Sequence, residues 1–244
     1  MAIALMVLVV EREFMKCANT LDDLALFKLL HIVSPTLPVG AFSYSQTLEW
    51  WVEKGLINNE SSFIDWLKDM TLYSQFKGDL CFFTEAYQCV STGDFKSLFD
   101  VNSLFLSSRE SSELRAETVQ MGYSLLKLIP EITQTNLDEL TCAQQSFGYP
   151  IAWALLSFHA GVSLHIAKKG FLWSWLENLV MVGVKVIPLG QTAGQRVLVT
   201  MVDFLSSHCE TEVFHNTFSP ITVLPGLAIA SANHETQYTR LFRS

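Results

Sequence analysis

The sequence is short of charged residues. Asp, Glu, Lys and Arg make up 16% of its 244 residues, whereas an average soluble domain carries roughly 25%. Hydrophobic residues make up 50%, which excludes an intrinsically disordered chain because disorder needs low hydrophobicity and high charge. The net charge is −8 and no basic patch occurs, so we expect no nucleic acid among its partners.

Long hydrophobic runs are also absent. A membrane-spanning helix needs about 20 apolar residues, and the apolar start of the chain ends already at Glu11. No positive residues precede that start, as they would in a secretory signal. The apolar stretches 150–167 and 171–187 contain polar side chains, so we interpret both as buried helices. We therefore expect a cytoplasmic protein with no membrane span.

Motifs for catalysis and metal binding are missing as well. The five cysteines include no CxxC pair, and their odd number in a long chain argues against a disulfide framework. The segment His234–Tyr238 resembles a zinc-protease motif, but Tyr238 occupies the position of the second histidine ligand. His159 and His165 are six residues apart and lie on different helical faces. We expect no enzyme activity and no metal or cofactor bound directly by this chain.

Helical periodicity, interrupted by Gly and Pro, is present throughout, and strand-like alternation is not. This pattern predicts an all-α fold, a compact single-domain bundle of about eight to ten helices. The expected helices cover residues 20–32, 46–54, 61–70, 79–92, 94–106, 108–128, 150–168, 172–187 and 191–207. The expected N-caps are Thr20, Ser61 or Ser62, Asp79 and Ser108.

The two ends of the chain differ from its middle. We expect residues 1–20 to form a poorly ordered extension, 21–231 the helical domain and 232–244 a partner-binding tail. Met15 is an alternative start of the protein, and the sequence leaves this open. Residues 208–231 contain two prolines and are predicted to form a loop.

Charge is concentrated in the first 140 residues, which hold 19 acidic and 10 basic residues. The last 104 residues carry only 11 charges, so we expect that half to be deeply buried, covered by a partner, or both. In the predicted helix 108–128, one face is expected to be exposed. It carries Arg109, Glu110, Glu113, Arg115 and Glu117.

Polar residues embedded in the apolar C-terminal half are candidates for function. They are Glu177, Lys185, Gln191, Gln195 and Arg196. Burying such charges is costly unless they are paired. One interpretation is an internal ion-pair network that holds two helices together. The other is a contact surface on which the charges are shared with another protein.

Two further segments contain aromatic residues suited to protein contacts. The loop residues Pro38, Gly40, Phe42 and Tyr44 form either a packed turn or an exposed recognition loop. In the tail, Tyr and Arg are residue types that dominate binding hot spots, and the candidates are Tyr238, Arg240, Phe242 and Arg243. The tail either docks on its own core or orders on binding a partner, and we favour the second.

Five segments match one protein family in their order and spacing. They are Ser34–Gln46 (SPTLPVGAFSYSQ) followed by Leu48–Trp50 (LEW), Arg109–Arg115, Trp173–Asn178 (WSWLEN), Lys185–Arg196 (KVIPLGQTAGQR) and His234–Ser244. No single one is diagnostic, but together they resemble the UreF family of urease accessory proteins. One departure is Ala41, where many relatives have a second glycine after Gly40.

The resemblance implies an all-helical, non-enzymatic chaperone of nickel insertion into urease. Such proteins bind the accessory protein UreD, also called UreH, and recruit the nickel-carrying GTPase UreG. The complex then docks on apo-urease, and it is the complex that handles the nickel. The UreF-like subunit is implied to couple or gate GTP hydrolysis with nickel delivery, and to form a homodimer.

The resemblance also implies roles for the candidate residues. The group from Glu177 to Arg196 would face UreG or form a structural polar cluster, with Lys185 the first choice for influencing UreG. The tail candidates would bind UreD. The alternative function is a helical metal-binding or membrane-associated adaptor unrelated to urease.

Overall fold

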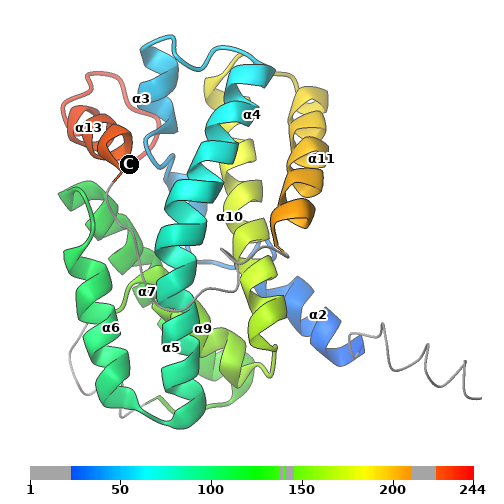
Figure 1. Cartoon of the computed structure of the whole chain (residues 1–244), viewed down its shortest axis with the longest axis vertical. Helices are drawn as coiled ribbons and strands as arrows, with labels where there is room; N and C mark the ends of the chain where they lie inside the picture. The colour runs from blue at the N-terminus through cyan, green and yellow to red at the C-terminus, as the bar shows by residue number, and fades with distance from the viewer. Residues whose placement is uncertain (1–22, 138–139, 141–145, 210–223) are drawn as a thin grey trace, which may run out of the picture.

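Residues 23–137, 140, 146–209 and 224–244 are described by the structure, a computed structural model, and within them helices occur and strands do not (Figure 1). The all-α prediction is confirmed. The helices are α2 (Asp23–Ile32), α3 (Leu48–Glu53), α4 (Glu60–Asp69), α5 (Leu80–Thr92), α6 (Phe95–Ser107), α7 (Ser112–Thr133), α9 (Tyr149–His159), α10 (Leu164–Val186), α11 (Gln191–His208) and α13 (Pro225–His234). A 3-10 helix, η1, covers Ala41–Ser43, and a π-helix, η2, covers Met70–Asp79. The predicted extension 1–20 lies outside the described residues.

Helix α9 is the centre of the bundle. Its residues Pro150 to Ser157 are all buried, because the segment is apolar on every face and α5, α7 and α10 pack around it. Trp153 is fully buried, and its indole N–H donates to the Tyr149 hydroxyl at 2.8 Å. The low charge of this half of the chain is thus explained in part by burial.

Close approach of α7 to the start of α9 depends on Gly122. A Cβ atom at this position would lie 2.1 Å from the main-chain oxygen of Phe147, a contact that no side chain can make. Gly170 has a similar role, because a Cβ there would lie 2.6 Å from Leu29 of α2. The break predicted between residues 168 and 172 is absent, because Gly170 lies inside α10. The chain instead breaks at Gly161, whose φ is +75°.

Residues 60–92 form one continuous helical column, in which η2 joins α4 to α5 (Figure 1). The sequence predicted two separate helices here, with Asp79 as the cap of the second. The structure instead caps the column at Asn59, whose side chain accepts from the Ser62 N–H while Ser62 bonds back to Asn59. The other predicted end is confirmed, because Gly93 closes α5 in the left-handed conformation.

The predicted boundaries of α7 also need correction. Its N-cap is Ser111, whose hydroxyl accepts from the Leu114 N–H at 3.1 Å, and not Ser108. At the other end the helix continues through Pro130 to Thr133. Only one main-chain bond is lost at a proline, and the fully buried Ile129 anchors this last turn in the core.

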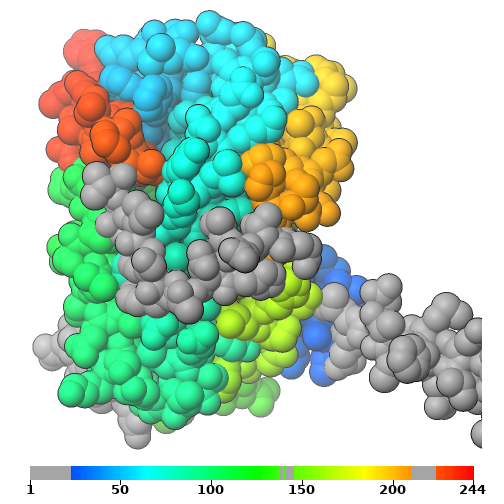
Figure 2. Space-filling model, viewed as in Figure 1, coloured from blue at the N-terminus to red at the C-terminus, as the bar shows by residue number. Residues whose placement is uncertain are grey.

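The C-terminal part of the chain holds a helix that the sequence did not predict. Helix α13 begins in the segment expected to be a loop and ends in the expected tail, and it packs against α3. Figure 2 shows these C-terminal residues (red) bordering the surface of residues near 50 (blue) and the green segment below. Of the helices in the described ranges, none is long and apolar enough to cross a membrane.

Candidate functional site

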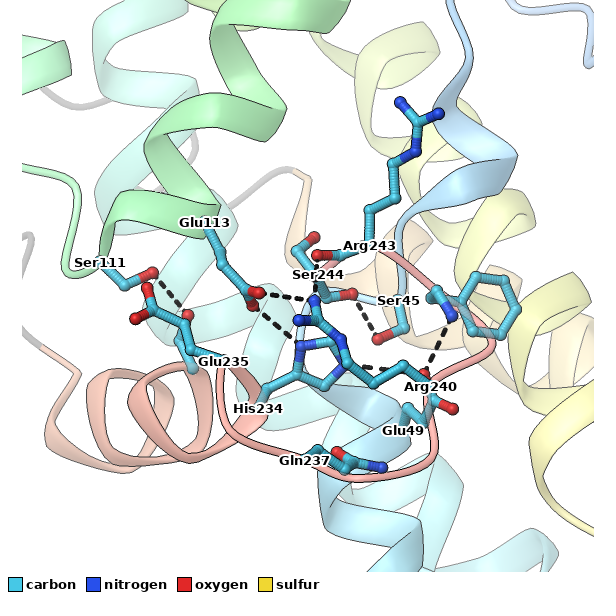
Figure 3. Close-up of polar contacts among 12 residues, drawn as sticks. Ser45, Glu49, Ser111, Glu113, His234, Glu235, Gln237, Arg240, Arg243 and Ser244 are labelled. Atoms are coloured by element: carbon cyan, nitrogen blue, oxygen red, sulfur yellow. Dashed lines mark hydrogen bonds and ion pairs between the residues drawn. The ribbon is translucent and has the colours of Figure 1, made fainter.

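The segment 235–244 docks on the core of its own chain (Figure 3). Phe242 is 7% exposed and Ser244 1% exposed. The Ser45 N–H donates to the main-chain oxygen of Ser244 at 2.6 Å, and the Arg243 N–H donates to Ser43 at 2.9 Å. The expectation that this segment is ordered only by a partner is therefore wrong. Its anchors are already present within the chain.

Three carboxylates hold this segment, and we call Glu49, Glu113 and Glu117 the carboxylate clamp. Glu49, at the start of α3, is 7% exposed. Its two oxygens accept the main-chain N–H groups of Leu241 at 2.7 Å and Phe242 at 3.1 Å. Charge-assisted bonds of this kind are stronger than bonds between neutral groups, so Glu49 fixes the path of the segment.

Glu113 of α7 is the second member of the clamp, and it binds two basic side chains. Its Oε2 lies 2.9 Å from Nδ1 of His234, and its Oε1 lies 2.5 Å from a guanidinium nitrogen of Arg240 (Figure 3). The same Arg240 group donates to the main-chain oxygen of Arg243. His234 is completely buried, with its Nε2 3.5 Å from Glu49, so it bridges two clamp residues.

Glu117, one turn further along α7, binds the last residue of the segment. It accepts from the Ser244 hydroxyl and from Nε2 of Gln46, the latter at 3.0 Å. Gln46 is in turn fixed by Trp175 of α10, whose indole N–H donates to Gln46 Oε1 at 2.7 Å. Burial raises the pKa of Glu117 to about 7, although its two hydrogen bonds act in the opposite direction.

These positions correct the prediction of an exposed face on α7. Glu117 is 5% exposed, and the side chains of Glu113 and Arg109 are 15% and 11% exposed. Of the five residues assigned to that face, Arg115 is exposed. The helical pattern was correctly recognised, but segment 235–244, which covers this face, is more than 100 residues further along the chain.

A second buried ion pair lies beside Glu117. A guanidinium nitrogen of Arg109 lies 3.0 Å from Oδ1 of Asp79, the last residue of η2. Burial raises the pKa of Asp79, and the charge of Arg109 opposes this. Burial likewise raises the pKa of Glu110. Acidic groups from η2 and α7 thus share one interior region.

The five polar candidates of α10 and α11 are not brought together as one cluster. Glu177 and Lys185 line the same cavity of about 190 Å³ between α10 and the loop 34–42. Arg196 instead pairs with Glu60 of α4 at 2.6 Å, on the exposed surface. Gln191 and Gln195 are also exposed. The pair between Arg196 and Glu60 joins α11 to α4, as the interpretation of ion pairs between helices expected. None of the other four candidates takes part in it.

Lys185 contacts the docked segment. Its Nζ lies 5.8 Å from the centre of the Phe242 ring, a cation–π contact. Burial raises the pKa of Glu177. Among the described residues, no ion pair joins Lys185 to Glu177. Lys185 is an exposed residue and lies beside the C-terminal segment.

The loop candidates divide between two environments. Gly40 has φ +80°, a conformation that favours glycine, and it leads into η1. Pro38 and Phe42 are exposed, the latter by 67%. Tyr44 is buried, and burial raises its pKa while the neighbouring Arg243 acts in the opposite direction. The loop is thus a packed turn at Tyr44 and an open surface at Phe42.

Side chains of the docked segment divide in the same way. Phe242 points into the core, whereas Tyr238, Leu241 and Arg243 are exposed. Together with Ile229 of α13, which is 57% exposed, Tyr238 and Leu241 add apolar area to this end of the molecule. The carboxylate clamp fixes the main chain of the segment on its core side, so the exposed side chains of Tyr238 and Leu241 are held at the surface.

Sequence reasoning missed the residues that build the site. Glu49 and Glu113 lie in segments that carried the family resemblance, and that was the available signal. His234 was considered as part of a failed zinc motif and as the first residue of a segment that carried the resemblance, but not as a buried partner of Glu113. In the part of the chain that the structure describes, no group of three or more His, Cys, Asp or Glu side chains could hold a metal ion. The geometry is that of a site that binds a peptide segment, here the segment 235–244 of the same chain.

Comparison with known proteins gives consistent matches. The UreF family model matches residues 57–202. The protein named urease accessory protein UreF from Azoarcus sp. (strain BH72) is 41% identical over 91% of this chain and 96% of its own length. The proteins of that name from Dechloromonas aromatica and Picosynechococcus sp. are 39% and 37% identical, over 91% and 88% of this chain and 98% of their own.

Proposed function

The chain belongs to the UreF family, and we propose that it bridges UreD (UreH) and the GTPase UreG during urease maturation. In this role it couples or gates GTP hydrolysis with nickel delivery to apo-urease, and the complex as a whole handles the nickel. The names of its relatives describe accessory proteins, which supports a non-enzymatic role and argues against an adaptor unrelated to urease. A cytoplasmic location stays a prediction.

The observation that carries the proposal is the docked C-terminal segment. Its main chain is fixed by the carboxylate clamp, and Tyr238 and Leu241 are left exposed. A pre-ordered segment loses little conformational entropy on binding, and exposed Tyr is a favourable anchor. We assign this surface to UreD. Of the four tail candidates, Arg240 and Phe242 act by holding the segment in place, while Tyr238 and Arg243 are exposed for contact.

We assign the surface around Lys185 and the loop 34–42 to UreG. Lys185 and Glu177 line one cavity there, beside the exposed Phe42 of the loop. A cation next to an exposed aromatic ring offers both a charge and an anchor to a partner. Gln191 and Gln195 are exposed on the neighbouring helix α11.

Helix α2 supports the expected homodimer. It lies at the edge of the bundle beside α10 (Figure 1). One of its faces is apolar and exposed. The exposed residues are Leu24, Phe27 and Leu30. We propose a second copy of the chain as the occupant of this face, because apolar surfaces of this kind mark protein interfaces.

The test is capture of UreD from cells that express the whole urease operon. Tyr238→Ala combined with Leu241→Ala should reduce co-purification of UreD at least tenfold, because both side chains are lost while the clamp contacts remain. Thr239→Ala, an exposed neighbour in the same segment, is the matched control. Unchanged capture by the double variant, with the control also unchanged, would exclude this surface. Deleting residues 233–244 should abolish capture too, but that deletion also removes His234 and opens the clamp.

A further inference from the structure

A small cavity lies behind the carboxylate clamp, where η2, α7, α10 and α13 meet. Its volume is about 60 Å³. One part of its wall is apolar and the other is polar. The polar lining includes Gln46, Gln75, Asp79, Arg109, Glu117 and Thr118.

Gln75, in the middle of η2, has an acceptor atom without a partner. The residue is 1% exposed, and its Oε1 makes no hydrogen bond within the protein. Asp79, four residues further along η2, lines the same cavity, and its carboxylate accepts hydrogen bonds and so offers Oε1 no donor. A buried amide oxygen without a donor is costly, so a partner is required.

Arg109 presents the complementary group. Its Nε–H is buried and has no acceptor within the protein, although its other nitrogens bind Asp79 and Ser108. The side chain lines the same cavity as Gln75. The wall therefore contains both an acceptor that lacks a donor and a donor that lacks an acceptor. Water is the small molecule that supplies both.

We propose that this cavity is a buried hydration site occupied by about four water molecules. They donate to Gln75 Oε1, accept from Arg109 Nε and reach the carboxyl group of Glu117. A volume of about 60 Å³ has room for them, since one water needs roughly 10–15 Å³. Apolar cavities of this size stay dry, but a wall with two unpartnered polar groups does not.

The position of the site gives it a role. Glu117 lines the cavity and also binds Gln46 and Ser244, so the waters lie behind the contact that holds the C-terminal segment. Protein atoms isolate Glu117 from bulk solvent, and the waters provide hydrogen-bonded partners through which its proton can exchange. The hydration site thus belongs to the support of the carboxylate clamp, and it does not depend on which partner binds outside.

The test is water-oxygen magnetic relaxation dispersion on the full chain, which detects internal waters with long residence times. The wild-type protein should show such waters. Gln75→Met keeps the length of the side chain and removes the acceptor, so its dispersion amplitude should fall by the equivalent of at least one water. Gln88→Met, at an exposed position in the same helical column, is the matched control and should retain the wild-type amplitude.

Equal amplitudes for Gln75→Met and the control would overturn the proposal, as would a wild-type protein without long-lived waters. Should Gln75→Met fail to fold, a high-resolution crystal structure of the wild-type chain decides the question. Separate density peaks within hydrogen-bond distance of Gln75 Oε1 would support the site. An empty cavity, or a single ion with metal-like coordination, would overturn it.

Discussion

The clamped C-terminal segment and the α10–α11 face differ in how their charges are held. At the clamp, Glu113 binds a completely buried His234 and a partly buried Arg240. On the α10–α11 face, Arg196 pairs with Glu60 in solvent, and Lys185 contacts an aromatic ring. Buried charges depend on their partners, whereas exposed ones are hydrated without them. The clamp therefore serves the structure of the chain, and the open face leaves its charges available to another protein.

The largest effect is expected at the clamp. Glu113→Ala removes the carboxylate shared by the completely buried His234 and the partly buried Arg240 and leaves His234 with Glu49 alone, so the free energy of unfolding should fall by about 3–5 kcal/mol. Urea denaturation measures this change. Glu131→Ala, at an exposed position of the same helix, is the control and should have almost no effect. If Glu113→Ala lowered the free energy of unfolding no more than the control does, the ion pairs of the clamp would contribute as little to stability as the exposed pair on the α10–α11 face.

The second effect is a pH dependence that originates at Glu117. Its pKa is raised from 4.5 to about 7, so the folded state binds the proton more tightly than the unfolded state. The resulting stabilisation is complete below about pH 4.5 and is lost as the pH rises to about 7. Between these two pH values, the free energy of unfolding should therefore fall by a value on the order of 3 kcal/mol.

Glu117→Gln should remove this part of the pH dependence, because the amide is neutral at every pH. Urea unfolding at about pH 5 and pH 8 compares the two proteins. A slope should remain from Asp79 and Glu110, whose pKa values are also raised by burial. If the variant keeps the full wild-type slope, Glu117 does not titrate in this range.

A smaller effect on stability is expected at Lys185. Lys185→Ala removes one cation–π contact with Phe242, which is worth about 0.5–1 kcal/mol at an exposed site. Recruitment of UreG should nevertheless be lost in a pull-down from cells that express the urease operon. Lys169→Ala, on the same helix, is the control. Retained recruitment and urease activation would remove Lys185 from the proposed UreG surface.

The smallest effect is expected at Arg196. Arg196→Ala breaks an ion pair whose two side chains are 58% and 30% exposed, so both charges are hydrated without it. Thermal unfolding should show no measurable change at physiological salt. A clear drop in the unfolding temperature would make the α10–α11 face a structural element like the clamp.

The sequence predicted the helices well where periodicity and caps act locally. Gly93 ended α5 at the predicted boundary, and α6 begins next to the predicted residue 94, although the predicted N-caps at Ser61 or Ser62, Asp79 and Ser108 were wrong. The sequence-based prediction failed where contacts between distant segments determine burial and local structure. Nothing local to Glu117 indicates that Ser244 covers it, and nothing in 70–79 indicates a π-helix. The residue types of the tail were recognised, but their docking depends on Glu49, almost 200 residues earlier.

The docking of residues 240–244 on Ser45 and Glu49 has a consequence for biosynthesis. At about 5–20 residues per second, the ribosome makes Glu49 roughly 10–40 s before the segment that binds it. During that interval the carboxylates of α3 and α7 have no tail to hold, and they must remain hydrated. The nascent chain can assemble its α5–α7–α9 centre first, but the surface we assign to UreD does not exist until residues 235–244 have also been made. Binding of UreD would then report that residues 235–244 have been made and have docked on α3 and α7.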